Sequence, residues 1–213
     1  MDSAFLITAF TTLFVVIDPI GLTPLFVTLT HGTETRARRA IALRACLIAF
    51  AILAAFTIFG EAVLGFVGIS MPAFRVAGGA LLFLTALDML FERRTQRRED
   101  QAEGGAAEAP DPSVFPLSLP LIAGPGSIAT VILLAGGQDD VFGLVAILGV
   151  AAAVLLVVFV FFLASGLLER ALGKTGINIA TRLLGMLLAA LAVQFILDGL
   201  AAFGFAGGIA GGT

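Results

Sequence analysis

Six long apolar stretches constrain the fold of this chain more than any other feature. They lie near Ala4–Thr30, Ile41–Phe59, Pro72–Phe91, Val114–Ala135, Val141–Leu168 and Ile177–Phe205. A helix needs about 20 apolar residues to cross the hydrocarbon core of a bilayer. Barrel strands would alternate polar and apolar side chains, and open sheet edges are not viable in lipid, so we expect helices. The sequence therefore predicts an all-α membrane protein of six transmembrane helices.

Composition agrees with a membrane location and argues against an enzyme. The 213 residues are 59% hydrophobic and 13% charged, whereas soluble domains are about 45–50% apolar and about 25% charged. The loops are too short for a soluble catalytic domain. The single cysteine, Cys46, lies inside an apolar stretch and is expected to pack there, and the single histidine, His31, is expected in a loop. We therefore expect no catalytic residues, no metal site, no cofactor apart from a coupling ion, and no nucleic-acid partner.

The basic residues predict the orientation. Ten of the 12 lysines and arginines follow the first, third and fifth stretches, in the segments 36–44, 93–98 and 170–174. The loops on the other side carry Glu61, Asp139 and Asp140 instead. The positive-inside rule places the basic loops in the cytoplasm. We therefore expect a multi-pass protein of the bacterial inner membrane with both termini outside, and with its first apolar stretch retained.

The two halves of the chain resemble each other. Three pairs of motifs recur in the same order: Asp18-Pro19-Ile20-Gly21 with Gly124-Pro125-Gly126-Ser127, Arg75-x-x-Gly78 with Arg182-x-x-Gly185, and Leu87-Asp88 with Leu197-Asp198. Three crossings per half is an odd number, so the second half would be inverted. We expect one three-helix repeat over 1–92, a flexible cytoplasmic linker over 93–113, and the inverted repeat over 114–213. Inverted repeats are frequent in secondary transporters, although some channels have them too.

Prolines and glycines interrupt the first and fourth stretches at equivalent places. One interruption runs from Asp18 to Pro24, and the other includes Pro116, Pro120 and the segment 124–127. These residues weaken helices, so we expect both helices to unwind near mid-membrane. Unwound backbone at that depth is tolerated only inside protein or beside a wet cavity, and matched interruptions are typical of a transport site. A structural kink packed against its neighbours is the alternative.

The helix restarts after these interruptions indicate the substrate. Thr23-Pro24 fits an N-cap followed by proline at the first helical position, and Ser127 fits a second N-cap. Free N–H groups at a helix start bind a carboxylate, and the preceding carbonyl end suits an ammonium group. Both ends together suit a small amino acid. The predicted substrate-binding residues are Asp18, Pro19, Gly21, Thr23, Gly124, Pro125, Gly126, Ser127 and Thr130.

Five ionisable residues are candidates for ion coupling or gating. Asp18 is expected near the midplane, where it would bind the substrate ammonium or a coupling H⁺ or Na⁺, or would cap N–H groups of the break instead. Arg75 and Arg182 would hold a broken-helix carbonyl end, pair with a carboxylate or gate one side, unless they extend to the interface. Asp88 and Asp198 lie near helix ends, so an interfacial position is their alternative.

The chain resembles the MarC family, which includes the SnatA-type small neutral amino acid transporters. Five blocks carry the resemblance: DPIGLTPLFVTLT (18–30), FRVAGGALLFLTALDML (74–90), PLSLPLIAGPGSIATVI (116–132), TGINIATRLLGMLLAAL (175–191) and QFILDGL (194–200). The resemblance implies six transmembrane helices and uptake of glycine, alanine and similar amino acids driven by a cation gradient. Functional residues carry over only as the two broken motifs and the arginine blocks.

Three functions follow as hypotheses. The leading one is a symporter that couples small neutral amino acids to H⁺ or Na⁺. The second is an exporter or facilitator of another small solute, and the third is a membrane scaffold or stress-response protein without transport. The lipid bilayer is an expected partner in each case. A homo-oligomer is left open, because Gly- and Ala-rich helix faces fit both intramolecular packing and helix dimers.

Overall fold

The computed structural model describes residues 3–94, 97–98, 111–138 and 140–204. Every regular element in these ranges is helical. The elements are α1 (Ser3–Ile17), α2 (Pro19–Leu29), α3 (Thr35–Val67), α4 (Met71–Leu90), the irregular wide helix η1 (Ser113–Ile122), α6 (Pro125–Ala135), α7 (Val141–Leu163) and α8 (Ser165–Ala202).

These elements supply up to six crossings of a membrane. Five helical segments in the described ranges are long and apolar enough to cross alone, and α1 with α2 counts as one of them, Ser3–Leu29. The sixth is η1 together with α6, which are bent by 56° relative to one another. The all-helical, multi-pass architecture predicted from the sequence is therefore confirmed, whereas the inverted repeat stays a prediction.

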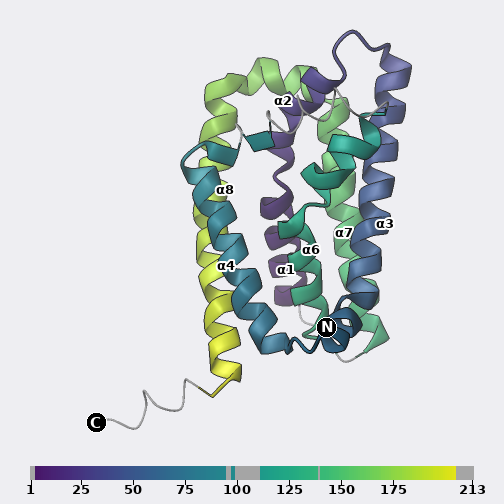
Figure 1. The fold of residues 1–213 in the computed structure, drawn as a ribbon. Coiled ribbons are helices and arrows are strands. Elements are labelled where there is room, and N and C mark those ends of the chain that lie inside the picture. Colours follow the sequence, from purple (N-terminus) through teal and green to yellow (C-terminus); the bar gives the residue numbers. More distant parts are fainter. Residues whose placement is uncertain (1–2, 95–96, 99–110, 139, 205–213) are drawn as a thin grey trace.

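The helices run up and down through one bundle (Figure 1). α1 and α2 ascend in the view, α3 descends, α4 ascends, η1 and α6 descend, α7 ascends and α8 descends. The start of α1 and the end of α8 therefore lie at the same end. The α2–α3 turn, the segment after α4 and the α7–α8 joint lie at the other end, and each of them carries or adjoins a cluster of basic residues.

The predicted boundaries differ most where the fifth and sixth stretches meet. α7 ends at Leu163 rather than at Leu168, and α8 already begins at Ser165. α8 bends at Gly173, whose φ of 58° interrupts the helix. Glycine tolerates that left-handed conformation because it lacks a Cβ. The short part of α8 before the bend crosses one end of the bundle, and the long part then descends (Figure 1). The predicted end of the sixth stretch, Phe205, lies outside the described residues.

Close backbone contact joins α4 to α8. A Cβ on Gly79 would lie 2.8 Å from the carbonyl oxygen of Ala192, and one on Gly199 would lie 2.9 Å from that of Pro72. The low-numbered end of α4 meets the high-numbered end of α8, so the two helices are antiparallel. Small residues permit such close approach of helices in membranes.

Apolar side chains cover the outside of the bundle as well as its core. The core includes Phe26 and Phe162, whose rings stack with centroids 4.3 Å apart. On the outside, Phe66, Val141 and Leu167 are 94%, 76% and 72% exposed. A soluble monomer rarely exposes so many large apolar side chains, whereas a bilayer accommodates them.

Candidate functional site

Asp18 makes the break in the first span. It follows α1 directly and adopts the left-handed conformation, with φ 57° and ψ 67°. Its Oδ1 accepts a hydrogen bond of 3.0 Å from the backbone N–H of Gly21, so the side chain is the N-cap of α2. Pro19 occupies the first helical position, where its missing N–H costs nothing. A Cβ on Gly21 would overlap Asp18 Oδ2, so this cap requires glycine three residues later.

The predicted N-cap at Thr23 is wrong. α2 starts at Pro19, and both Thr23 and Pro24 lie inside it. The Thr23 hydroxyl donates to the carbonyl of Pro19 at 2.9 Å and is fully buried. The chain offers two residue pairs with the same cap–proline pattern, and the helix begins at the earlier pair. The break is therefore one residue wide rather than the longer unwound segment expected from the sequence.

The second break separates η1 from α6. Gly124 precedes α6, Pro125 takes its first position, and no side chain caps this helix start. A Cβ on Gly124 would overlap the carbonyl oxygen of Pro120, so the chain requires glycine there as well. The predicted N-cap role of Ser127 is also wrong, because its hydroxyl donates toward the carbonyls of Ile122 at 2.7 Å and Gly124 at 3.0 Å. The N–H groups that open α6 consequently keep no side-chain acceptor.

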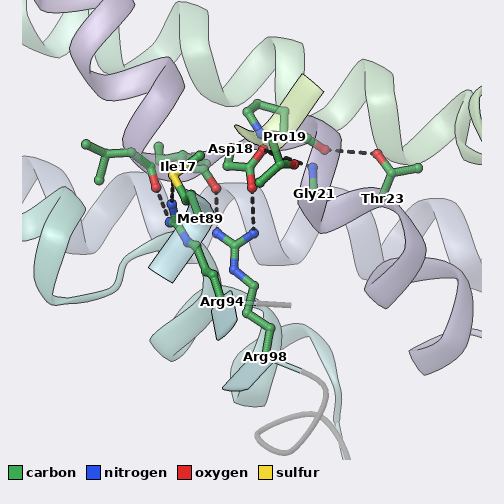
Figure 2. A network of polar contacts seen from close by, with 10 residues as sticks. Ile17, Asp18, Pro19, Gly21, Thr23, Met89, Arg94 and Arg98 are labelled. Carbon is green, nitrogen blue, oxygen red and sulfur yellow. Dashed lines mark hydrogen bonds and ion pairs between the residues drawn. The ribbon is translucent and has the colours of Figure 1, made fainter. Parts of the chain in front are cut away.

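Two arginines from the segment after α4 reach the first break (Figure 2). Arg98 Nη1 donates to Asp18 Oδ2 at 3.1 Å, and Arg98 Nη2 donates to the carbonyl of Ile17 at 2.9 Å. Arg94 Nη2 donates to the carbonyl of Val16. These arginines thus satisfy the carbonyl groups that α1 leaves free at its end. Thr181 of α8 adds a long contact, 3.5 Å from its hydroxyl to Asp18 Oδ1.

The ion pair of Arg98 and Asp18 is buried, with side-chain exposures of 7% and 1%. Burial lowers the pKa of Arg98, while the charge and hydrogen bond of Asp18 raise it. Burial, together with the nearby charge of Arg98, likewise lowers the pKa of Arg94 to about 9, although the charges of Asp18 and Asp88 oppose this shift. Asp18 therefore offsets the desolvation of two neighbouring cations. Removing its charge would leave them without that compensation.

A cavity of about 250 Å³ lies between the two breaks. Val16 lines it from the first break, and the segment from Gly124 to Ser127 lines it from the second. The breaks face each other closely, because a Cβ on Gly126 would lie 3.2 Å from Val16 Cγ1. Thr85 and Asp88 of α4 line the cavity too, together with Arg94, Arg97 and Arg98. Arg97 pairs with Asp88 at the cavity wall.

Comparison of the sequence with known protein families identifies the family. The family model for MarC family integral membrane proteins matches residues 3–203, almost the whole chain. The chain belongs to the MarC family. The membrane protein YvbG of Bacillus subtilis is 41% identical over 202 residues, which cover 94% of this chain and 96% of that protein. The inner membrane protein YhgN of Escherichia coli is 35% identical over 201 residues, 92% of this chain and 95% of that protein. No solved structure matches the chain.

In this MarC-family chain, the predicted site residues divide into two groups. Gly124, Pro125, Gly126, Ser127 and Asp88 line the cavity. Asp18, Pro19, Gly21, Thr23 and Thr130 do not line it. Asp18 meets the cavity only through Arg98, and the hydroxyl of Thr130 donates to the carbonyl of Gly126 within its own helix.

The other three predicted ionisable residues lie apart from the cavity. Arg75 Nη2 is 3.4 Å from the carbonyl of Gly136, at the far end of α6 rather than at a break. Arg182 pairs with Glu92 at 2.8 Å, and both side chains are about half exposed. Asp198 accepts a hydrogen bond from Gln194 one turn earlier in α8 and is exposed.

Sequence reasoning missed Arg94, Arg97 and Arg98 as site residues, because it assigned them to the basic loop after the third stretch. Only their position, a few residues after α4, could have indicated that they reach the breaks. Residues 95–96 and 99–110 of the predicted linker, 93–113, lie outside the described residues. Among the residues that the structure describes, no group of three or more His, Cys, Asp or Glu could hold a metal ion.

Proposed function

We propose that this MarC-family chain is a secondary active transporter of small neutral amino acids, coupled to H⁺ or Na⁺, and that the cavity between the two breaks is its substrate site. The uncapped start of α6 on the cavity wall is the observation that carries the proposal. A helix start with free N–H groups and a positive dipole end attracts a carboxylate.

The charges around the cavity fit both ends of an amino acid. Arginine side chains line the cavity together with the α6 start, and their positive charge favours binding of the substrate carboxylate. Asp88 is the carboxylate that lines the cavity, and it becomes the partner for the ammonium group when the substrate displaces Arg97 from it. The volume of about 250 Å³ lies below the 300–1,000 Å³ of ligand pockets for drug-sized molecules, which favours a small solute.

In this proposal, the conformational step is the separation of the ion pair between Arg98 and Asp18. While Arg98 is bound, both Asp18 oxygens have partners, so the carboxylate is not free for an ammonium group or a cation. Separation of the pair would free Asp18 for H⁺ or Na⁺ and open the end of the bundle where the segment after α4 lies. The predicted coupling role of Asp18 thus requires Arg98 to move.

A second candidate solute has one supporting observation. Three arginines and one aspartate line the cavity, which is a net positive set of side chains. Such a lining also fits a small organic anion without an ammonium group, carried by an exporter or facilitator. Competition decides between the two: an amino acid transporter is inhibited by alanine and serine, and an anion carrier by short carboxylic acids.

The test is uptake of radiolabelled glycine into proteoliposomes that hold the purified protein, with Na⁺ and pH gradients imposed separately. We expect accumulation that follows one gradient and that alanine inhibits. Gly126→Leu should abolish uptake, because the new side chain enters the cavity next to Val16. Gly149→Leu is the matched control, since a Cβ there meets no atom within 4 Å. Absence of uptake by correctly folded protein under either gradient would refute the proposal.

A further inference from the structure

A second polar pocket lies away from the cavity, between the start of α3 and the α7–α8 joint. Its volume is about 360 Å³, and its polar lining consists of Thr35, Arg38, Arg39, Ser165 and Arg170. We call it the basic pocket. No residue of the basic pocket lines the cavity between the two breaks, so a ligand could occupy the basic pocket whether or not the cavity transports a solute.

Arg38 is fixed in the wall of the basic pocket. Its guanidinium group lies over the ring of Phe26, 5.2 Å from the centroid, and Nη2 donates to Ser165 Oγ at 2.6 Å. Ser165 in turn donates to the carbonyl of Phe162 at 2.8 Å, so its oxygen is oriented to accept from Arg38. This positioning reduces the entropy that a ligand would otherwise have to remove from a flexible arginine.

One donor of Arg38 is left over. The Nε atom is buried and has no hydrogen-bond partner in the part of the chain that the structure describes. A buried donor without an acceptor is costly, so such an atom indicates a missing acceptor. The guanidinium group is therefore held by Phe26 and Ser165 while still lacking one of its acceptors.

The charge of the basic pocket is unbalanced. Three arginines line it, and no carboxylate does among the side chains that the structure describes. Among side chains that the structure describes, no carboxylate oxygen lies within ion-pair distance of Arg38, Arg39 or Arg170. The pocket also includes Thr35, the first residue of α3, and no side chain caps that helix start. The dipole of α3 adds to the attraction for an anion.

The surroundings indicate a lipid as the source of the anion. The basic pocket lies at the end of two membrane-spanning helices, where α3 begins and α7 ends. Its apolar lining includes Leu163 and Leu167, which are 47% and 72% exposed and face outward from the bundle. A phosphate with attached acyl chains satisfies both parts of this lining, because the chains would lie along the exposed leucines. Basic pockets between transmembrane helices bind anionic lipid head groups.

We propose that the basic pocket binds the phosphate group of an anionic phospholipid, with Arg38, Arg39 and Arg170 as its ligands. Zwitterionic phosphatidylcholine carries the same phosphate, but its choline cation would be repelled by the arginines. The pocket should therefore prefer phosphatidylglycerol to phosphatidylcholine.

The experiment titrates the purified full-length chain in detergent with phosphatidylglycerol and counts bound lipids by native mass spectrometry. We expect a saturable first lipid that phosphatidylcholine does not replace. Each arginine near a membrane surface contributes about fivefold to such binding, so Arg39→Gln and Arg170→Gln should each weaken it by about that factor. Arg36→Gln is the matched control, because Arg36 belongs to the same turn of basic residues but does not line the pocket.

Arg38→Gln should weaken binding most, but this change also removes the contacts with Phe26 and Ser165 and can unfold the chain. The exposed variants Arg39→Gln and Arg170→Gln keep the proposal testable in that case. Equal binding of the two lipids, or equal loss in Arg36→Gln and Arg170→Gln, would overturn the proposal. If inorganic phosphate alone prevents phosphatidylglycerol from binding, the natural ligand of the pocket is a soluble phosphate and the lipid proposal is wrong.

Discussion

Arg98 and Asp18 are 80 positions apart in the sequence and form a buried ion pair, with Nη1 and Oδ2 separated by 3.1 Å. The pair joins the segment after the third crossing to the middle of the first crossing. Asp18 is the N-cap of α2, and Arg98 also donates to the last carbonyl of α1. The pair therefore satisfies backbone groups on both sides of the helix break.

Loss of this pair should destabilise the protein strongly. Arg98→Gln leaves the Asp18 charge buried and unpaired, which costs about 3–5 kcal/mol for a buried pair. Asp18→Asn should cost a similar amount, and the double variant should cost less than the sum of the two. Thermal and denaturant unfolding in detergent measure these differences. Arg93→Gln is the control, because Arg93 is exposed. Equal effects of Arg93→Gln and Arg98→Gln would contradict the expected outcome.

The exposed pair of Arg182 and Glu92 should matter far less. Their side chains are 52% and 43% exposed, and solvent screens such a pair to about 0–1 kcal/mol. Arg182→Gln should therefore leave the unfolding temperature nearly unchanged under conditions where Arg98→Gln lowers it. A large loss of stability in this variant would contradict the expected outcome. A loss of transport would restore Arg182 as a site residue, which is the role that the sequence favoured.

Two glycine substitutions should have effects of opposite sign. Gly21→Ala displaces the Asp18 side chain from its cap and should destabilise the protein by about 0.5–2 kcal/mol, the usual value of an N-cap. Gly65→Ala lies in α3, where a Cβ meets no atom within 4 Å, and should stabilise by up to about 1 kcal/mol. Unfolding of both variants in the same detergent checks the difference. Stabilisation by Gly21→Ala would show that the cap is dispensable.

The two aspartates that close the proposed repeats should differ in transport. Asp88 lines the cavity, so Asp88→Asn removes the proposed ammonium partner, and a charged hydrogen bond contributes about 1.5–3 kcal/mol. We expect the apparent affinity for glycine to fall roughly tenfold or more. Asp198→Asn should leave glycine uptake unchanged, because Asp198 is exposed and bound to Gln194. The measurement is the concentration dependence of uptake in proteoliposomes, and an equal loss in both variants would contradict a specific role for Asp88.

The sequence was sufficient for the features that depend on local chemistry. Apolar length predicts the crossings, and the proline and glycine motifs predict where the first and fourth of them are broken. The interpretation of Asp18 as a cap for local N–H groups, which stood as the alternative, is what the structure shows. The competing start at Thr23 carries the same local pattern, so local chemistry alone could not choose between the two.

The contacts of the segment after α4 could not be predicted in the same way. Arg94 and Arg98 look like any basic residues beside a membrane, and the rule that places them in the cytoplasm describes the side of the membrane rather than the depth a side chain reaches. Their partners, Val16, Ile17 and Asp18, become close only when the bundle is assembled and α4 packs against α6 and α8. Such long-range contacts have no signature in a single sequence.

The glycines between α4 and α8 have a mechanical consequence. With Gly79 and Gly199 against opposing backbone carbonyls, the two backbones are in close contact at two places along the interface, which resists sliding of one helix along the other. The two helices should therefore move as one rigid body. Any motion that exposes the cavity first to one side and then to the other must occur where the remaining helices meet α4 and α8. A covalent cross-link between α4 and α8 should leave that motion free.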